Sequence, residues 1–260
     1  MAFFDQTPIW LLYLLTVGFA LLAGELGFRL SQWIYQRRPD AKKDTALDAL
    51  IASLLGLLAF LLAFTTGFGL SHYDRRQQLV VSEANAIGTS YLRAGYLNDD
   101  DLTEARELLR EYTDVRLSAV DAMNWESALA RSEEIQARLW AIAEQNGREY
   151  PDSIAVGLFG EAINQLIDIH TSRLIALIVD RIPVLMWIML YTVAFLAFLM
   201  VGVVSSVDGK RNYFALVLFA LGFAAVLTLL LDMDRSQQGL IRVSQRALIE
   251  LQRQIGSISP

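Results

Sequence analysis

One face of the apolar segment between Leu50 and Leu70 carries an aromatic stripe. At a spacing of four residues, this segment contains Gly56, Phe60, Phe64 and Phe68. Residues four apart lie on one slightly slanted line of an α-helix. Aromatic stripes of this kind often pack against neighbouring helices or lipid. Copies of the helix around a symmetry axis would instead stack the rings into an apolar constriction, which gates ions by dewetting. The spacing therefore predicts either packing or the neck of an ion pathway.

Polar side chains lie beside the stripe and beyond its end. Thr65 lies within the apolar segment, and the sequence Ser71-His72-Tyr73-Asp74-Arg75-Arg76 follows it. One interpretation is a helix end at the membrane surface, whose long side chains snorkel and pair at i,i+4. The alternative is a water-filled vestibule in which polar side chains meet permeating ions. On this second interpretation, Phe60 and Phe64 form the constriction. The flanking residues are then Gly56, Thr65, Phe68 and His72, and those of the vestibule are Asp74, Glu83 and Asn85.

The elements that position these residues are predicted to be membrane-spanning helices. The chain has 260 residues and is 54% hydrophobic, above the ~45–50% typical of soluble domains. Apolar runs occur from Pro8 to about Gly24, at Leu50–Leu70, at Ile182–Ser205, and from Tyr213 to about Leu231. A helix of ~20 apolar residues crosses a bilayer. We therefore expect an all-α, four-span integral membrane protein with the lipid bilayer as a partner.

A long aqueous region is predicted between spans two and three. The second helix continues past His72 with an apolar face at helical period, formed by Leu79, Val80, Glu83, Ala84, Ile87, Tyr91 and Leu92. Further helical patterns follow, and they include a coiled-coil-like seam from Leu108 to Ala122. The predicted parts are spans one and two (1–71), a helical extramembrane region (72–181), spans three and four (182–231), and an amphipathic tail helix (232–260) that packs on the bundle or on a neighbouring subunit.

Composition excludes several classes of protein. The region from His72 to Arg181 contains eleven Arg, no Lys and nineteen Asp or Glu, a net charge of −8, so nucleic acid is not expected as a partner. There is no Cys and there are only two His, which leaves no Cys- or His-rich metal site within one subunit. Asn98–Asp101 is explained by helix capping. No catalytic motif is found, so we expect no enzyme activity, no catalytic residues, no metal and no cofactor.

Two stretches resemble a known family. Phe60-Leu61-Leu62-Ala63-Phe64, with His72-Tyr73 eight residues later, looks like the second membrane helix of bestrophins, and the order of spans and insertion is similar. Leu79–Ala94 resembles the bestrophin-like domain family of bacterial integral membrane proteins, and that resemblance covers nearly the whole chain. It implies a pentamer in which apolar residues of span two form the neck of an anion channel. Phe60 and Phe64 match two neck positions, and Gly56 stands at the third.

Departures from the bestrophin pattern limit what the resemblance implies. Gly56 replaces an aliphatic neck residue, and Leu57 replaces the proline that follows it. His72-Tyr73-Asp74 stands in place of Arg-Trp-Trp, and the acidic calcium-binding run after span four is reduced to Asp232 and Asp234. Anion selectivity and calcium gating are therefore not carried over to this chain.

Two criteria give opposite orientations in the expected location, a bacterial inner membrane. The loops after spans one and three hold all three Lys, namely Lys42, Lys43 and Lys210. Basic residues in short loops favour the cytoplasm, which places the helical region in the periplasm. The resemblance implies a cytoplasmic helical region.

Two functions are compatible with these patterns. The first is a homo-oligomeric ion channel, a pentamer by resemblance, with inorganic ions passing a neck lined by span two. The second is a non-conducting membrane scaffold or sensor whose helical region binds partners, which the seam from Leu108 to Ala122 suggests.

Overall fold

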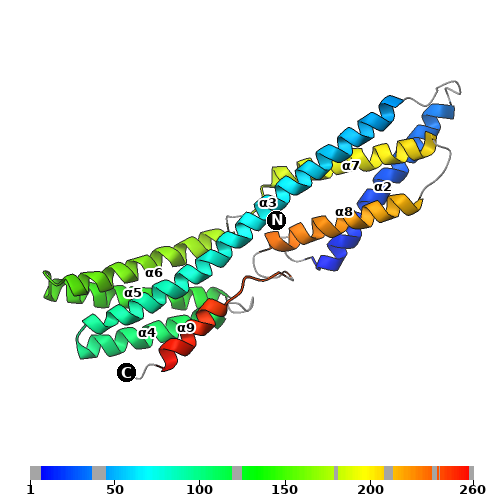
Figure 1. Cartoon of the computed structure of the whole chain (residues 1–260). Helices are drawn as coiled ribbons and strands as arrows, with labels where there is room; N and C mark the ends of the chain where they lie inside the picture. Colours follow the sequence, from blue (N-terminus) through cyan, green and yellow to red (C-terminus); the bar gives the residue numbers. More distant parts are fainter. Residues whose placement is uncertain are drawn as a thin grey trace. The chain divides into compact units, whose positions relative to one another are not determined.

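The described secondary structure is helical throughout. The computed structural model describes residues 7–36, 45–118, 125–178, 181–207, 213–235, 239 and 241–257. Its elements are α2 (Ile9–Gln36), α3 (Thr45–Arg93), the 3₁₀ turn η1 (Ala94–Tyr96), α4 (Asp99–Ser118), α5 (Trp125–Glu149), α6 (Ile154–Ile178), α7 (Val184–Val207), α8 (Tyr213–Asp234) and α9 (Arg246–Ser257) (Figure 1). The predicted all-α fold is confirmed. Leu108, Tyr112 and Val115 of the predicted seam lie in α4, whereas its end at residues 119–122 and most of both basic loops lie outside the described residues.

The chain divides into two compact units. Unit 1 contains Met1–Ser71, Arg181–Arg235 and Gly239–Ile241, and unit 2 contains His72–Asp180, Ser236–Gln238 and Arg242–Pro260. Helix α3 contributes to both, because its 49 residues contain no proline and no internal helix stop. The two units are described separately below.

Unit 1 holds the four apolar helices that the sequence predicted. Four helices are long and apolar enough to cross a membrane: Ile9–Ile34, Leu47–Tyr96 (which includes the predicted aqueous extension of α3), Val184–Ser206 and Tyr213–Asp234. Helix α7 begins one residue after Pro183, whose carbonyl accepts the amide of Met186 at 2.9 Å. Because lipid offers no hydrogen-bond partners, helices satisfy the backbone of such segments internally.

Glycine allows two of these helices to touch backbone to backbone. A Cβ atom added at Gly27 of α2 would lie 1.9 Å from the carbonyl oxygen of Leu199 in α7, and one at Gly202 would lie 1.9 Å from the carbonyl oxygen of Gly24. Both distances are far below van der Waals contact. Helices α2 and α7 therefore approach at a distance that only glycine permits, as small residues do at membrane helix interfaces.

Unit 2 is a bundle of the second half of α3 with α4, α5, α6 and α9 (Figure 1). Its buried core includes Ile87, Tyr91, Leu109, Leu139 and Phe159. Helices α4 and α5 are joined by two arginine–glutamate pairs seven residues apart on each helix. Arg131 donates to Glu111 at 2.7 and 2.9 Å, and Arg138 donates to Glu104. These pairs are partly exposed, so they help to fix the antiparallel register more than they add stability.

The tail helix packs on its own chain. Leu248, Leu251 and Ile255 of α9 are buried in the core of unit 2. The carbonyl oxygen of Ile255 accepts a hydrogen bond from Arg110 Nε at 3.2 Å, and Gln252 donates to Asp114 at 2.6 Å. Of the two locations that the sequence left open for this helix, the structure places it on the bundle of the same subunit.

The α2–α7 contact predicts that adding a single methyl group at either glycine strongly lowers the stability of the protein. Gly27→Ala and Gly202→Ala should each destabilise the protein by about 1–3 kcal/mol or more, because overpacking forces the helices apart. Thermal unfolding of the detergent-solubilised protein, followed by circular dichroism, measures this. Gly18→Ala is the matched control on α2, because a Cβ there meets no described atom within 4 Å. Equal melting temperatures for Gly27→Ala and Gly18→Ala would contradict the contact.

Candidate functional site

The aromatic stripe lies on an exposed face of α3. Phe60, Phe64 and Phe68 are 64%, 53% and 39% exposed within the single chain. The rings of Phe60 and Phe64 stack with centroids 6.2 Å apart, and Phe64 meets Phe68 edge-on at 5.1 Å. A Cβ at Gly56 would project into open space. The stripe therefore does not pack inside the subunit, which leaves lipid, another subunit or a pore as its surroundings.

Helix α3 is the least covered of the four spans. Only 6% of its most apolar stretch is buried within the chain, against 28% to 33% in the other three spans. The covered side includes Leu58, which joins the core of unit 1 with side chains of α2, α7 and α8. Most of the α3 span therefore remains available for contacts beyond its own subunit.

Eight of the exposed residues of α3 follow one line along the helix. In steps of three or four they are Phe60, Phe64, Gly67, Ser71, Asp74, Gln78, Val81 and Asn85. At 100° per residue, all eight fall within a sector of about 100°. We call these eight residues the exposed band of α3. The band is apolar up to Gly67 and mainly polar from Ser71 onward, so its chemistry changes near the predicted membrane boundary.

Several predicted site residues, among them Thr65 and His72, lie off this band. Thr65 is only 2% exposed, and its hydroxyl donates to the carbonyl oxygen of Leu61 at 2.7 Å. One residue corresponds to 100° of helix, which turns Thr65 from the face of Phe64 to the covered side. His72 is half-buried, whereas Asp74 and Asn85 are exposed. The structure thus brings Phe60, Phe64, Asp74 and Asn85 onto one face and separates Thr65 from them.

Glu83 is a correction to the predicted vestibule. It is 0% exposed, and it lies in the interior of unit 2. Its Oε1 accepts Arg116 Nε at 2.9 Å and the hydroxyl of Tyr112 at 2.9 Å, and its Oε2 pairs with Arg173. A carboxylate so enclosed cannot contact passing ions. Instead it joins α3 to α4 and α6, and a buried charge of this kind requires such partners.

Sequence reasoning missed the partners of Glu83. Burial lowers the pKa of Arg116, and burial lowers the pKa of Arg173 to about 10. Burial also raises the pKa of Tyr112 to about 12. At neutral pH the two guanidinium groups are charged and the phenol is protonated, so all three donate to the carboxylate. The available signal was Glu83 itself, which shares a helical face with Val80, Ala84 and Ile87.

His170 completes this buried network. Tyr112 gives its only proton to Glu83, so its oxygen accepts from Gln136 Nε2 at 3.2 Å and from His170 Nδ1 at 3.0 Å. This assignment places the imidazole proton on Nδ1. Within the described residues, His170 Nε2 is buried without a hydrogen-bond partner. Burial and the nearby charge of Arg116 lower the pKa of His170 to about 4, so the ring stays neutral.

The two acidic residues after span four accept hydrogen bonds from backbone amides. Asp232 Oδ2 accepts the amide of Ile241 at 2.8 Å, and Asp234 Oδ1 accepts the amide of Ile182 at 2.8 Å. Both are therefore engaged in unit 1. Over the described part of the chain, no three His, Cys, Asp or Glu side chains are grouped so as to hold a metal ion.

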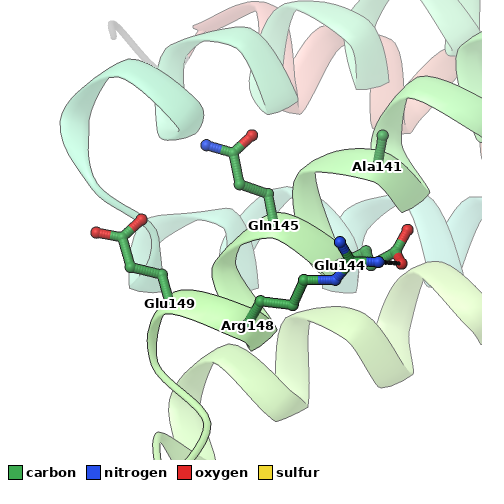
Figure 2. Close-up of a pocket in the computed structure, with 5 residues that line it drawn as sticks. All are labelled: Ala141, Glu144, Gln145, Arg148 and Glu149. Carbon is green, nitrogen blue, oxygen red and sulfur yellow. Dashed lines mark hydrogen bonds and ion pairs between the residues drawn. The ribbon is translucent and has the colours of Figure 1, made fainter.

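A surface hollow on unit 2 offers little chemistry. Its lining residues all come from α5: Ala141, Glu144, Gln145, Arg148 and Glu149 (Figure 2). Glu144 and Arg148 form an ion pair with one another, while Glu149 points to the other side (Figure 2). Their charges do not converge on a common point, so this hollow is not a candidate site.

Comparisons with known proteins agree with this architecture. A family model for the bestrophin-like domain matches residues 15–248. The chain belongs to the bestrophin-like family. Bestrophins are channels rather than enzymes, so membership supports an ion-channel function. No match was found among curated proteins.

Solved structures share the bestrophin-like fold. A variant of a bacterial bestrophin homologue from Klebsiella pneumoniae is 14% identical with a TM-score of 0.67, covering 96% of this chain and 98% of that one. A second crystal structure, of a membrane protein variant, is 15% identical with a TM-score of 0.68, covering 95% and 97%. At these identities the likeness shows the fold alone. The predicted family and the four-span helical fold are confirmed.

The buried histidine predicts a pH dependence of stability. The imidazole has a pKa of about 4 in the folded chain and an ordinary value near 6.5 when unfolded. Between these values the unfolded chain binds more protons, so lowering the pH from about 6.5 to 4 should remove about 3 kcal/mol of stability. The free energy of unfolding of the detergent-solubilised protein, measured in urea over this pH range, tests the effect.

The only other histidine provides the control for that experiment. In His170→Gln the free energy of unfolding should change less between pH 6.5 and pH 4, because the amide still donates to Tyr112 but does not titrate. His72→Gln should keep the slope of the natural protein. If the free energy of unfolding of His170→Gln depends on pH as steeply as that of the natural protein, other groups cause the dependence.

Proposed function

We propose that this bestrophin-like chain forms a homo-oligomeric ion channel, a pentamer, whose neck is lined by Phe60 and Phe64 of α3. The observation that carries the proposal is the exposed aromatic face on the least covered span. Five copies of α3 facing an axis would stack these rings into consecutive apolar collars. Such collars exclude water, and with it ions, unless they widen.

The flanks of this neck follow from the spacing of four residues along α3. Gly56 and Phe68 adjoin the two rings on either side, with open space beyond the Gly56 backbone. A glycine ring would be wider than the phenylalanine rings, so the narrowest level falls at Phe60 and Phe64. Past His72, Asp74 and Asn85 would face the vestibule. Thr65 and Glu83 are left out of the lining because both are buried in the subunit.

Truncation of one ring tests the neck. Phe64→Ala should raise the single-channel current roughly tenfold if the ring contributes about 1.4 kcal/mol to the barrier for ions. Planar-bilayer recording of the purified oligomer is the measurement. Phe214→Ala is the matched control, because Phe214 on α8 is also exposed within the chain but belongs to another helix. Silence of both the natural protein and Phe64→Ala across ion conditions would refute the channel.

We further propose that the protein resides in the inner membrane with unit 2 in the periplasm. The basic loops after α2 and α7 support this orientation, because short basic loops remain in the cytoplasm. A phosphatase that is active only in the periplasm, fused after Pro260, should then be active. Activity of a cytoplasmic reporter at the same position would instead establish the orientation that the resemblance to bestrophins implies.

A further inference from the structure

We propose that Asp74 gives the ion pathway its preference for cations. This inference rests on the proposed channel function and adds to it a residue that determines which ions pass. It is carried by the exposure of Asp74, by its lack of a partner in the described chain, and by its position on the exposed band of α3.

Asp74 presents an exposed negative charge. Its side chain is exposed, and within the described residues it takes part in no hydrogen bond or ion pair. Of the two neighbouring arginines, Arg76 is buried, whereas Arg75 is exposed about 100° around the helix from Asp74, and both interact within the chain. Glu83, the next acid on α3, is enclosed by two arginines. Between Ser71 and Asn85, therefore, Asp74 is the exposed α3 residue that presents negative charge to its surroundings.

The position of Asp74 relates it to the neck. It follows Phe64 by ten residues, about 15 Å along a helix, and it lies about 40° around the helix from Phe60. It is therefore on the same face as the rings but well outside the apolar collar. At that distance it does not narrow the pathway. It would act on ions before they enter the neck or after they leave it.

A symmetric oligomer would multiply this charge. Each copy of the chain would add one carboxylate at the same level of the pathway, and rings of carboxylates favour cations. Clefts lined by one sign of charge raise the local concentration of counter-ions by roughly 10- to 1000-fold. The net charge of −8 between His72 and Arg181 has the same sign. No charged side chain lies on the exposed band between Phe64 and Asp74 to oppose it.

A substitution at Gln78 tests whether this face of α3 lines the ion pathway, as well as whether the charge matters. It is exposed one turn beyond Asp74 on the same band. A carboxylate at Gln78 would face the same pathway as Asp74. The double variant Asp74→Asn/Gln78→Glu therefore keeps the charge of the natural protein and moves it by four residues, about 6 Å.

Reversal potentials in a tenfold KCl gradient measure the effect, with purified protein in planar bilayers at low salt, where screening is weakest. The natural protein should prefer potassium over chloride. Asp74→Asn should lower the permeability ratio roughly tenfold, and Asp74→Asn/Gln78→Glu should restore most of it. Asp152→Asn is the control, because it removes an exposed acid from the turn before α6 and should leave the ratio unchanged.

The outcomes separate this inference from the channel proposal. An unchanged ratio in Asp74→Asn, a chloride preference in the natural protein, or no recovery in the double variant would overturn the role of Asp74 while the conducting channel stands. Absence of current from every variant, the natural protein included, would refute the channel itself.

Discussion

Unit 2 depends on the hydrogen bonds and ion pairs that the carboxylate of Glu83 forms in its interior. The carboxylate accepts hydrogen bonds from groups on two other helices, Tyr112 and Arg116 of α4 and Arg173 of α6; Tyr112 and Arg116 are buried, and the side chain of Arg173 is 12% exposed. A single ionised group buried without partners would cost many kcal/mol, so these side chains stabilise one another only as a set. These contacts can form together at only one rotation of α3 about its own axis within unit 2.

That rotation decides which residues α3 presents outward. With Glu83 turned inward, Val80, Ala84 and Ile87 enter the core, and Gln78, Val81 and Asn85 are turned out. Asp74 follows the same register. The polar part of the exposed band is thus a consequence of a buried charge on the same helix. Without Glu83, the rotation of α3 would depend on its buried apolar residues and on hydrogen bonds such as those of Gln77 and Arg93.

Much of the fold could be predicted from sequence because the membrane leaves few alternatives. The runs that became α2, α7 and α8 have no charges at their centres and are long enough to span a bilayer, and helices are what such runs form. The site was predicted less well. A spacing of four placed Phe60 and Phe64 on one face, but it did not say whether that face was covered; the structure shows that their own subunit leaves it open. Glu83 was assigned to a vestibule although its spacing from Val80 and Ile87 also matched the core. Its partners lie 29 to 90 residues away, and local periodicity does not report such distant pairs.

The glycine contact between α2 and α7 has a mechanical consequence. Helices separated by interlocking side chains can shear past one another by small side-chain rearrangements. Here the carbonyl oxygens of Leu199 and Gly24 lie against the glycine backbones of the opposite helix, with no side chain between them to rearrange. A displacement along either axis would bring a neighbour such as Phe28 or Leu199 against that backbone. We therefore expect α2 and α7 to move as one rigid pair, so that any rearrangement within unit 1 is taken up by its other helices.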